Sequence, residues 1–300
     1  MEIITDPVIR SLDITPLQCI DWVTESFSIK EKSQLPVKLS VHPSASDFIN
    51  TMPCLLPPGY GVFGCKIVSR HRCSSPSLKS HITIFDSTDG RMLALFEADW
   101  ITAMRTGAVA AVAAGALLRS GASVFSILGL GVTARSVMRC LAARFSDRQL
   151  TVRLLDYKDH ASRFISEFSS LPGITFEVCG SMRSLVGDAD LVVSCVTEAD
   201  TLLVSDLSWF RPGVLLMPVH TRGFQNCDTV FDRVVADDEG HVRHFANFSR
   251  FRSFVELADV LSGHKHGRLD DEERIISYNI GLGLHDVVFA YKIYHMLCRQ

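Results

Sequence analysis

A glycine turn between a predicted strand and a predicted helix constrains this 300-residue chain more than any other feature. The turn reads Gly129-Leu-Gly-Val-Thr-Ala134 and follows the apolar run 123–128, which we predict to be a buried β-strand. Behind it, apolar residues recur at helical spacing at Ala134, Val137, Met138 and Leu141. In such a strand–turn–helix the glycines permit the turn and the close approach of a pyrophosphate, and a small third residue lets the helix pack on the sheet. The sequence therefore predicts a Rossmann-type α/β fold that binds a dinucleotide.

The dinucleotide motif also requires an acidic residue at the end of the next strand, about 20 residues further on. Asp156 ends the predicted strand 150–156 and meets this requirement. Its carboxylate would bind the hydroxyls of the adenosine ribose and repel a 2′-phosphate, which favours NAD over NADP. Lys158 could meet such a phosphate, so NADP stays an alternative. In a second interpretation Asp156 only starts the turn 156–159.

Composition restricts the class of protein. Hydrophobic residues make up 47% of the chain and charged residues 21%, as in a soluble globular protein with a sizeable core. The net charge is −3 and the longest basic patch, 70–72, is short, so we expect no nucleic-acid partner. We read no apolar stretch as a membrane span and no signal at the N-terminus, so we expect no membrane and a cytoplasmic location. The 9 cysteines lack a Cys-x-x-Cys pair, which fits reduced thiols.

From about residue 120 to about residue 260, predicted strands and helices alternate. Beyond the two strands of the glycine motif, largely apolar strands are predicted at 174–178, 189–196, 213–219 and 233–237. Apolar strands that alternate with helices are typical of a parallel sheet buried on both faces. This region is therefore predicted to be a doubly wound parallel sheet.

The region before residue 120 has a different pattern. A helix is predicted over 15–30, where Pro16 follows a threonine cap, and then β-like runs alternate with turns, as expected for a mixed α/β region of antiparallel hairpins. A last helix over 284–297 is expected to return to this region. We therefore predict a substrate-binding and dimerisation domain formed by residues 1–119 with 277–300, and a dinucleotide-binding domain formed by residues 120–276.

Two basic residues lie where a cation needs an explanation. If Thr102 caps the alanine-rich helix that follows, Arg105 lies in its first turn, where the helix dipole disfavours a cation. A substrate carboxylate over the helix end would explain it, and an arginine turned outward to a surface partner is the alternative. Lys66 interrupts the otherwise apolar strand 61–69. Taken alone, a lysine in this position favours an edge strand. If Lys66 instead points into a cavity, burial would lower its pKa and suit it to proton transfer.

Several segments share the pattern of one known family. They are Met52-Pro53, Lys66-Ile67-Val68, the turn 88–94, Thr102-Ala-Met-Arg-Thr-Gly-Ala108, the glycine turn and Gly281-Leu-Gly-Leu-His-Asp286. On these segments nearly the whole chain resembles the ornithine cyclodeaminase/μ-crystallin family. The resemblance implies a Rossmann-type sheet with a second α/β domain, an NAD(P) cofactor, a small amino- or imino-acid substrate and a homodimer.

The resemblance also implies roles for individual residues. Arg105 and Lys66 would anchor a substrate carboxylate, and Lys66 would also take part in proton transfer. Asp286 would lie near the nicotinamide or the substrate; a carboxylate that only faces a helix N-terminus is the alternative. The implied cofactor-binding residues are Thr106, Gly129, Gly131, Val132, Thr133, Ala134, Asp156, Tyr157, Cys195, Val196 and Thr197.

The chain departs from the cyclodeaminases of this family at both positions that would bind a cationic side chain. An acidic residue before Met-Pro is replaced by Asn50-Thr51, and an aspartate-containing loop after the fifth strand is replaced by the segment 219–224. A site with Arg105, Lys66 and Arg222 should reject a diamine and accept a second carboxylate. The chain is thus closer to the siderophore-pathway branch, whose members oxidise a carboxylated secondary amine with NAD. That branch has a Leu-Arg-Asp loop, so the match is partial.

His220 is expected at the carboxyl end of a sheet strand, where open α/β sheets bind ligands. Its ordinary pKa would suit proton transfer, and a histidine satisfied within its own loop is the alternative. His241 and His244 have a metal-like spacing without a third ligand, so no metal is predicted. Cys195 and Cys227 are interpreted as core or loop thiols rather than nucleophiles.

These observations together predict an NAD(H)-dependent oxidoreductase that transfers a hydride to or from a carbon–nitrogen centre next to a carboxylate. The substrate would be an amino acid, a cyclic imino acid or an opine-like conjugate. Arg105 and Arg222 would orient carboxylates, and Lys66 or His220 would move the proton. Two alternatives stay open: a cyclodeaminase-like lyase that recycles its NAD, and a non-catalytic NAD(P)H-binding protein of the crystallin type.

Overall fold

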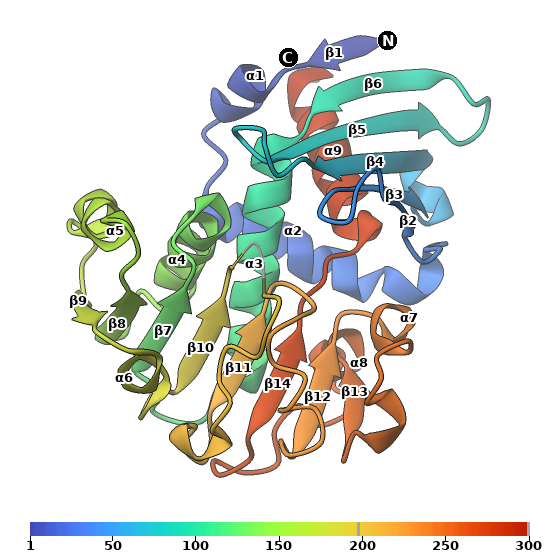
Figure 1. The fold of residues 1–300 in the computed structure, drawn as a ribbon. Coiled ribbons are helices and arrows are strands. Elements are labelled where there is room, and N and C mark those ends of the chain that lie inside the picture. Colours follow the sequence, from blue (N-terminus) through green and yellow to red (C-terminus); the bar gives the residue numbers. More distant parts are fainter. Residues whose placement is uncertain (197–198, 299–300) are drawn as a thin grey trace. The chain divides into compact units, whose positions relative to one another are not determined.

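The computed structural model describes residues 1–196 and 199–298, and the chain divides into two units (Figure 1). Unit 1 consists of Met1–Arg105 with Gly281–Gln300, and unit 2 consists of Thr106–Ile280. The first boundary falls inside helix α3 (Asp99–Leu117), whereas the sequence interpretation set it after residue 119. The second falls after Ile280 rather than after residue 276.

Unit 1 is built on a six-stranded sheet in the order β1-β6-β5-β4-β3-β2. Its strands are β1 (Glu2–Ile4), β2 (Leu39–Val41), β3 (Phe48–Leu55), β4 (Val62–Arg70), β5 (Leu78–Asp86) and β6 (Met92–Glu97). Strands β2 to β6 pair antiparallel, as the hairpin pattern predicts, and β1 joins β6 in parallel. Strand β4 is paired with β3 and β5 along its length, Lys66 facing Met52 on one side and Ile82 on the other. The edge-strand interpretation of Lys66 is therefore wrong.

Among its described residues, unit 1 contains three helices besides the start of α3, and one of them, α9, covers a face of this sheet. They are α1 (Asp6–Arg10), α2 (Pro16–Ser28) and α9 (Gly283–Cys298), with short 3₁₀ turns η1 (Lys30–Lys32) and η2 (Pro58–Tyr60). Helix α9 lies against β3, β4 and β5, and α2 packs on α9 (Figure 1). Helix α2 begins at Pro16 as predicted, because Thr15 caps it in a reciprocal capping box with Gln18. Helix α9 packs directly on β4, the strand that carries Lys66, and Asp286 in its first turn pairs with that lysine.

The opposite face of the same sheet carries exposed apolar side chains. Along β4 the residues alternate, so that Val62 and Val68 are buried while Phe63 and Ile67 are 36% and 45% exposed. On the edge strand β2, Leu39 and Val41 are more than half exposed. A sheet face with this composition is typical of a surface that another protein surface covers.

Unit 2 is an eight-stranded, wholly parallel sheet in the order β13-β12-β14-β11-β10-β7-β8-β9. Its strands are β7 (Val124–Leu128), β8 (Leu150–Leu155), β9 (Ile174–Cys179), β10 (Leu191–Ser194), β11 (Leu215–Pro218), β12 (Arg233–Ala236), β13 (Phe254–Glu256) and β14 (Ile275–Tyr278). Every residue of β10, β11, β12 and β14 is buried, which fits strands covered on both faces. The doubly wound sheet is confirmed. The strand order reverses between β7 and β10, which makes their carboxyl ends the expected ligand edge.

The remaining helices belong to the connections of this sheet. They are α4 (Val132–Arg144), α5 (His160–Phe168), α6 (Met182–Val186), α7 (Glu239–Val242) and α8 (Leu257–Leu261), with η3 (Leu207–Trp209) and η4 (Phe248–Arg250).

The sequence interpretation found no apolar stretch long enough for a membrane span, and helix α3 corrects it, because α3 has the length and apolarity of such a span. Since 67% of its most apolar window is buried in the structure, its apolarity is that of a core helix.

Candidate functional site

The glycine turn has the geometry that its motif requires. Gly129 adopts a φ of +81°, and a Cβ there would lie 2.7 Å from the backbone nitrogen of Val196, so only glycine fits. Gly131 precedes α4, and a Cβ there would have no atom within 4 Å. Ala134 is fully buried in the first turn of α4. The turn is thus packed at its first glycine and open at its second, where a phosphate group would approach the helix N-terminus.

Asp156 follows the end of β8 and is exposed. Its Oδ1 accepts a hydrogen bond from the backbone N–H of Ala161 at 2.9 Å, so the carboxylate does support the turn into α5. Lys158 lies over the ring of Tyr157, which is itself 64% exposed. The acidic residue therefore has a structural contact and an accessible position at once.

The other predicted cofactor residues lie at three places in unit 2. Val132 and Thr133 form the start of α4, Thr106 lies in α3, and Cys195 and Val196 directly follow β10 beside Gly129. Thr197 lies outside the described residues. Desolvation raises the pKa of the Cys195 thiol to about 12, and burial also raises the pKa of the Cys227 thiol. Both cysteines are therefore neutral thiols, as expected for residues that are not nucleophiles.

In unit 1 the fold brings together three residues that the sequence singled out. Lys66 Nζ lies 2.5 Å from Asp286 Oδ2, and Arg105 Nε donates a hydrogen bond to Asp286 Oδ1 at 3.1 Å. Lys66 and Asp286 are fully buried, and Arg105 is 6% exposed. Gly281, with a φ of +95°, allows the close approach of the Arg105 guanidinium, because a Cβ at this position would collide with it. Two cations thus share one carboxylate in a buried cluster.

This cluster changes the explanation for Arg105. Helix α3 begins at Asp99, so Thr102 is not its N-cap and Arg105 lies in its second turn rather than its first. The dipole argument for an anion at the helix end is therefore wrong. Instead, Arg105 is tied to the carboxylate of Asp286 in the first turn of α9. The interpretation of Asp286 as a carboxylate that only faces a helix N-terminus is incomplete for the same reason.

Burial and the neighbouring charges of the cluster change the pKa of Lys66. Burial, and then the positive charge of Arg105, lower the pKa of Lys66 to about 7, against an opposing contribution from Asp286. Lys66 Nζ and Asp286 Oδ2 meet as an ion pair outside hydrogen-bond geometry, and neither atom has a hydrogen-bond partner among the described residues. A lysine whose pKa lies near 7 can take up or release a proton near neutral pH.

His285, directly before Asp286, was missed by the sequence interpretation. It is fully buried, its Nδ1 lies 2.5 Å from Ser26 Oγ in α2, and its ring packs on Phe27. Burial, with the charges of Arg105 and Lys66, holds the pKa of His285 well below its ordinary value. The ring is therefore neutral and adds no third positive charge. Its position in an apolar helical segment next to a functional carboxylate is the only signal that the sequence offered.

His220 follows β11, at the carboxyl edge of the parallel sheet where it was expected. Its Nε2 lies 2.7 Å from Ser194 Oγ at the end of β10. Burial lowers the pKa of His220 to about 4, while a hydrogen bond with the backbone of Arg222 opposes this shift. The imidazole is neutral at pH 7, which favours the interpretation of a locally satisfied histidine over that of a proton donor. Arg222 itself is exposed.

The two histidines with metal-like spacing have different surroundings. His241 is buried with its Nδ1 3.5 Å from Asp237 Oδ1, whereas His244 is exposed. His244 packs its ring on Phe245. His241 thus pairs with Asp237 from within α7, and the two rings have different partners.

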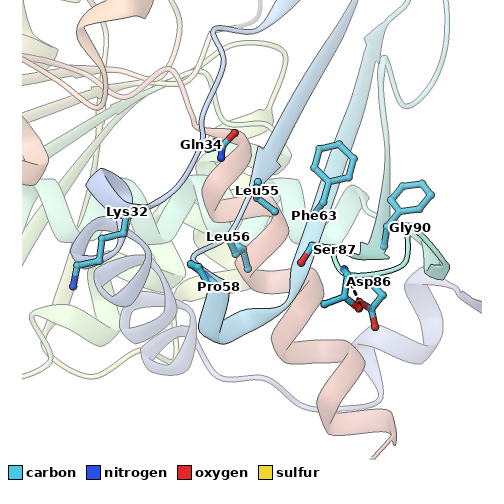
Figure 2. A pocket seen from close by; sticks show the side chains of 11 residues that line it. Lys32, Gln34, Leu55, Leu56, Pro58, Phe63, Asp86, Ser87 and Gly90 are labelled. Carbon is cyan, nitrogen blue, oxygen red and sulfur yellow. Dashed lines mark hydrogen bonds between the residues drawn. The ribbon is translucent and has the colours of Figure 1, made fainter.

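A cavity of about 680 Å³ opens elsewhere in unit 1 (Figure 2). Its apolar lining includes residues of β3, β4, β5 and η2, and polar residues complete it. The lining residues are Lys32, Gln34, Leu55, Leu56, Pro58, Phe63, Phe85, Asp86, Ser87, Thr88 and Gly90. None of the predicted site residues is among them. Phe63 links this cavity to the exposed apolar face of the sheet.

Comparison with known proteins places the chain among relatives of similar length. The model of the family "Ornithine cyclodeaminase/mu-crystallin family" matches residues 8–300. The chain is 26% identical over 262 residues to a Delta(1)-pyrroline-2-carboxylate reductase of Bacillus cereus, covering 81% of this chain and 79% of that protein. It is 24% identical over 278 residues to the N-((2S)-2-amino-2-carboxyethyl)-L-glutamate dehydrogenase of Staphylococcus aureus, covering 85% and 80%.

A solved structure has the same fold over nearly the full length. It is the Thermococcus litoralis Delta(1)-pyrroline-2-carboxylate reductase in complex with NADH and L-proline, with a TM-score of 0.87 at 24% identity, and the match covers 98% of this chain and 97% of that one. The glycine turn, the buried cluster and a family model that spans nearly all residues agree. The chain belongs to the ornithine cyclodeaminase/mu-crystallin family.

Proposed function

We propose that this protein is an NAD(P)-dependent oxidoreductase that acts on the carbon–nitrogen bond of an amino or imino acid. The buried cluster of Lys66, Asp286 and Arg105 carries this proposal. It combines a cation that can bind a carboxylate with a lysine that exchanges a proton near pH 7. Relatives named as a pyrroline-carboxylate reductase and as a dehydrogenase of a glutamate conjugate support the same reaction class.

The residues of unit 2 fit a dinucleotide. The open backbone at Gly131 and the N-terminus of α4 would hold the pyrophosphate, and Asp156 would hold the adenosine ribose. We propose NAD as the preferred cofactor, with NADP as the alternative. In Asp156→Asn the contact to Ala161 can persist while the negative charge is lost. This variant should therefore shift the preference from NADH toward NADPH, as measured by the ratio of kcat/KM values.

The chain's own residues divide the work of the reaction. The bound cofactor supplies or removes the hydride. Arg105 binds the substrate carboxylate and so fixes the neighbouring carbon, and Lys66 Nζ delivers a proton to the substrate nitrogen or removes one from it. Asp286 holds both cations in position. His220 and Arg222 stay predicted site residues, with Arg222 as a contact for a second carboxylate.

The substrate class follows from the missing acidic partners. Asn50 and Thr51 stand where the cyclodeaminases carry an acidic residue, and Arg222 stands in the loop where they carry an aspartate. We therefore propose an opine-like or cyclic imino acid with more negative than positive charge. Ornithine should be a poor substrate for this site.

Unit 1 supports a homodimer. The exposed side chains of Phe63, Ile67, Leu39 and Val41 form an apolar sheet face that a second copy could bury. Ile67→Glu should convert a dimer into a monomer in sedimentation experiments. Val178→Glu changes an exposed apolar residue of unit 2 and should leave the oligomeric state unchanged. No disulfide bond joins any of the 9 cysteines, all of which lie in the described part of the chain, and this supports the proposed cytoplasmic location.

A change in nicotinamide absorbance tests the proposal. Purified protein with NADH should reduce Δ1-pyrroline-2-carboxylate, Δ1-piperideine-2-carboxylate or a pair of 2-oxo acid and amine. Ammonia release from ornithine without net change in NADH would instead indicate a cyclodeaminase. Tight NADH binding without turnover of any imine would indicate the non-catalytic alternative.

A further inference from the structure

The surroundings of Lys66 would also suit a second kind of chemistry besides proton transfer. Its amine is fully buried on the central strand β4, where water does not compete for it. Asp286 Oδ2 lies 2.5 Å from Nζ and has no hydrogen-bond partner among the described residues. Arg105, on the other oxygen of the same carboxylate, is the anchor proposed for the carboxylate of the substrate. An amine, a proton acceptor and a carboxylate anchor therefore lie together.

This is the combination that lysine nucleophiles use. A lysine that is desolvated and lies next to a second cation loses its proton easily, and the free amine attacks carbonyl carbons. In this chain both causes act on Lys66, and with its pKa lowered to about 7 a large share of the amine is neutral at neutral pH. A 2-oxo acid held by Arg105 would present its carbonyl carbon next to the carboxylate that Arg105 binds.

We propose that Lys66 forms a Schiff base with a 2-oxo acid, so that the enzyme prepares its own imine from a 2-oxo acid and an amine. This inference rests on the proposed function and adds a step before hydride transfer. It adds a covalent activity to a residue that was expected only to bind the substrate carboxylate and to transfer a proton.

The step balances in atoms and electrons. The lone pair of neutral Lys66 Nζ adds to the carbonyl carbon, and the two Nζ hydrogens leave with the carbonyl oxygen as water, Asp286 Oδ2 relaying them. The nitrogen of the second substrate, a primary amine, then adds to the same carbon. Its two hydrogens pass to Lys66 Nζ, which departs as the free amine. The product is the substrate imine, and nothing is oxidised or reduced until NADH acts on it.

Another lysine of the same unit supplies a control. Lys79 is 54% exposed and paired with Asp99, so it shares the chemistry of an ordinary surface amine. A Schiff base that forms through intrinsic reactivity alone would label Lys79 as readily as Lys66. One that depends on the buried cluster would label Lys66 selectively.

Borohydride trapping tests the proposal. The full-length protein is incubated with glyoxylate, pyruvate or 2-oxoglutarate, reduced with sodium borohydride and mapped by peptide mass spectrometry. We expect one reduced adduct per chain at Lys66, retained in Lys79→Arg and absent in Lys66→Arg. Wild-type protein should also accelerate exchange of the carbonyl oxygen of the 2-oxo acid with heavy-oxygen water, without NADH, which needs no variant to fold.

A preformed cyclic imine separates this inference from the proposed function. Δ1-Piperideine-2-carboxylate already contains its imine, so its reduction by NADH requires no Schiff base at Lys66. If this imine is reduced while no adduct and no oxygen exchange are found, the Schiff base is excluded and the oxidoreductase stands. If the adduct and the exchange are found and no imine is reduced, the Schiff base stands and the oxidoreductase fails.

Discussion

Lys66 Nζ lies 2.5 Å from Asp286 Oδ2, and both side chains are fully buried. The lysine comes from the central strand of a sheet and the aspartate from the first turn of the last helix. Arg105 adds a second cation to the same carboxylate. Because a buried charge is costly without a partner, the three residues depend on one another, and their variants should show it.

Asp286→Asn should destabilise the protein by about 3–5 kcal/mol, because it leaves buried cations without their carboxylate. The loss should be smaller above pH 7 than below it, since Lys66 can release its proton there while Arg105 cannot. Urea unfolding at both pH values measures this difference. The control Asp89→Asn removes an exposed partner of Arg91 and should cost about 0–1 kcal/mol. Equal losses in the two variants would show that the buried cluster is not under electrostatic constraint.

The rate should follow the titration of Lys66 in opposite directions for the two reactions. With a pKa lowered to about 7, the ammonium form that donates a proton to an imine disappears as the pH rises through 7, so imine reduction should slow. The neutral form that accepts a proton appears over the same range, so amine oxidation should accelerate. Profiles of kcat against pH at saturating cofactor measure both pH dependences. Lys66→Arg should make both profiles flat near pH 7, and a pH dependence that persists in this variant would come from another group.

Arg105→Ala should raise KM for the carboxylated substrate roughly 10- to 150-fold, which corresponds to the loss of a hydrogen bond to a charged group. The same variant should also raise the pH at which the rate changes, because the charge of Arg105 lowers the pKa of Lys66. Steady-state kinetics across pH give both values. Arg91→Ala, which removes an exposed arginine of the same unit, should leave them unchanged. An unaltered KM in Arg105→Ala would remove Arg105 from the substrate site.

The two glycines of the turn should respond differently to a methyl group. Gly129→Ala meets the backbone of Val196 and Cys195 at positive φ and should cost more than about 1–3 kcal/mol of stability. Gly131→Ala meets no atom within 4 Å and should fold normally, yet weaken NADH binding at least about tenfold because the methyl occupies the phosphate approach. Thermal unfolding and fluorescence titration with NADH separate the effects. A Gly131→Ala protein that binds NADH as tightly as the wild type would refute the pyrophosphate assignment.

Local patterns in the sequence predicted much of the fold. Apolar alternation, glycine turns and the Thr15 cap depend on neighbouring residues, so the antiparallel sheet, the parallel sheet and the dinucleotide turn could be predicted. One predicted helix boundary is wrong. The sequence predicts Thr102 as the N-cap of a helix, but the helix begins three residues earlier, at Asp99. A threonine often caps a helix, but the backbone N–H of Thr102 already bonds the carbonyl of Ala98, which places Thr102 inside the first turn.

The sequence by itself determined the strand–glycine–helix turn, because backbone conformation and periodicity are properties of consecutive residues. Family motifs pointed to Lys66, Arg105 and Asp286, but the positions of these residues in the sequence do not show which of them form contacts. Only the tertiary structure put Lys66 on a central strand, gave it the carboxylate of Asp286 and placed Arg105 beside both. The physical reason is that a pKa depends on burial and on nearby charges, and both arise from packing between residues that are distant in sequence.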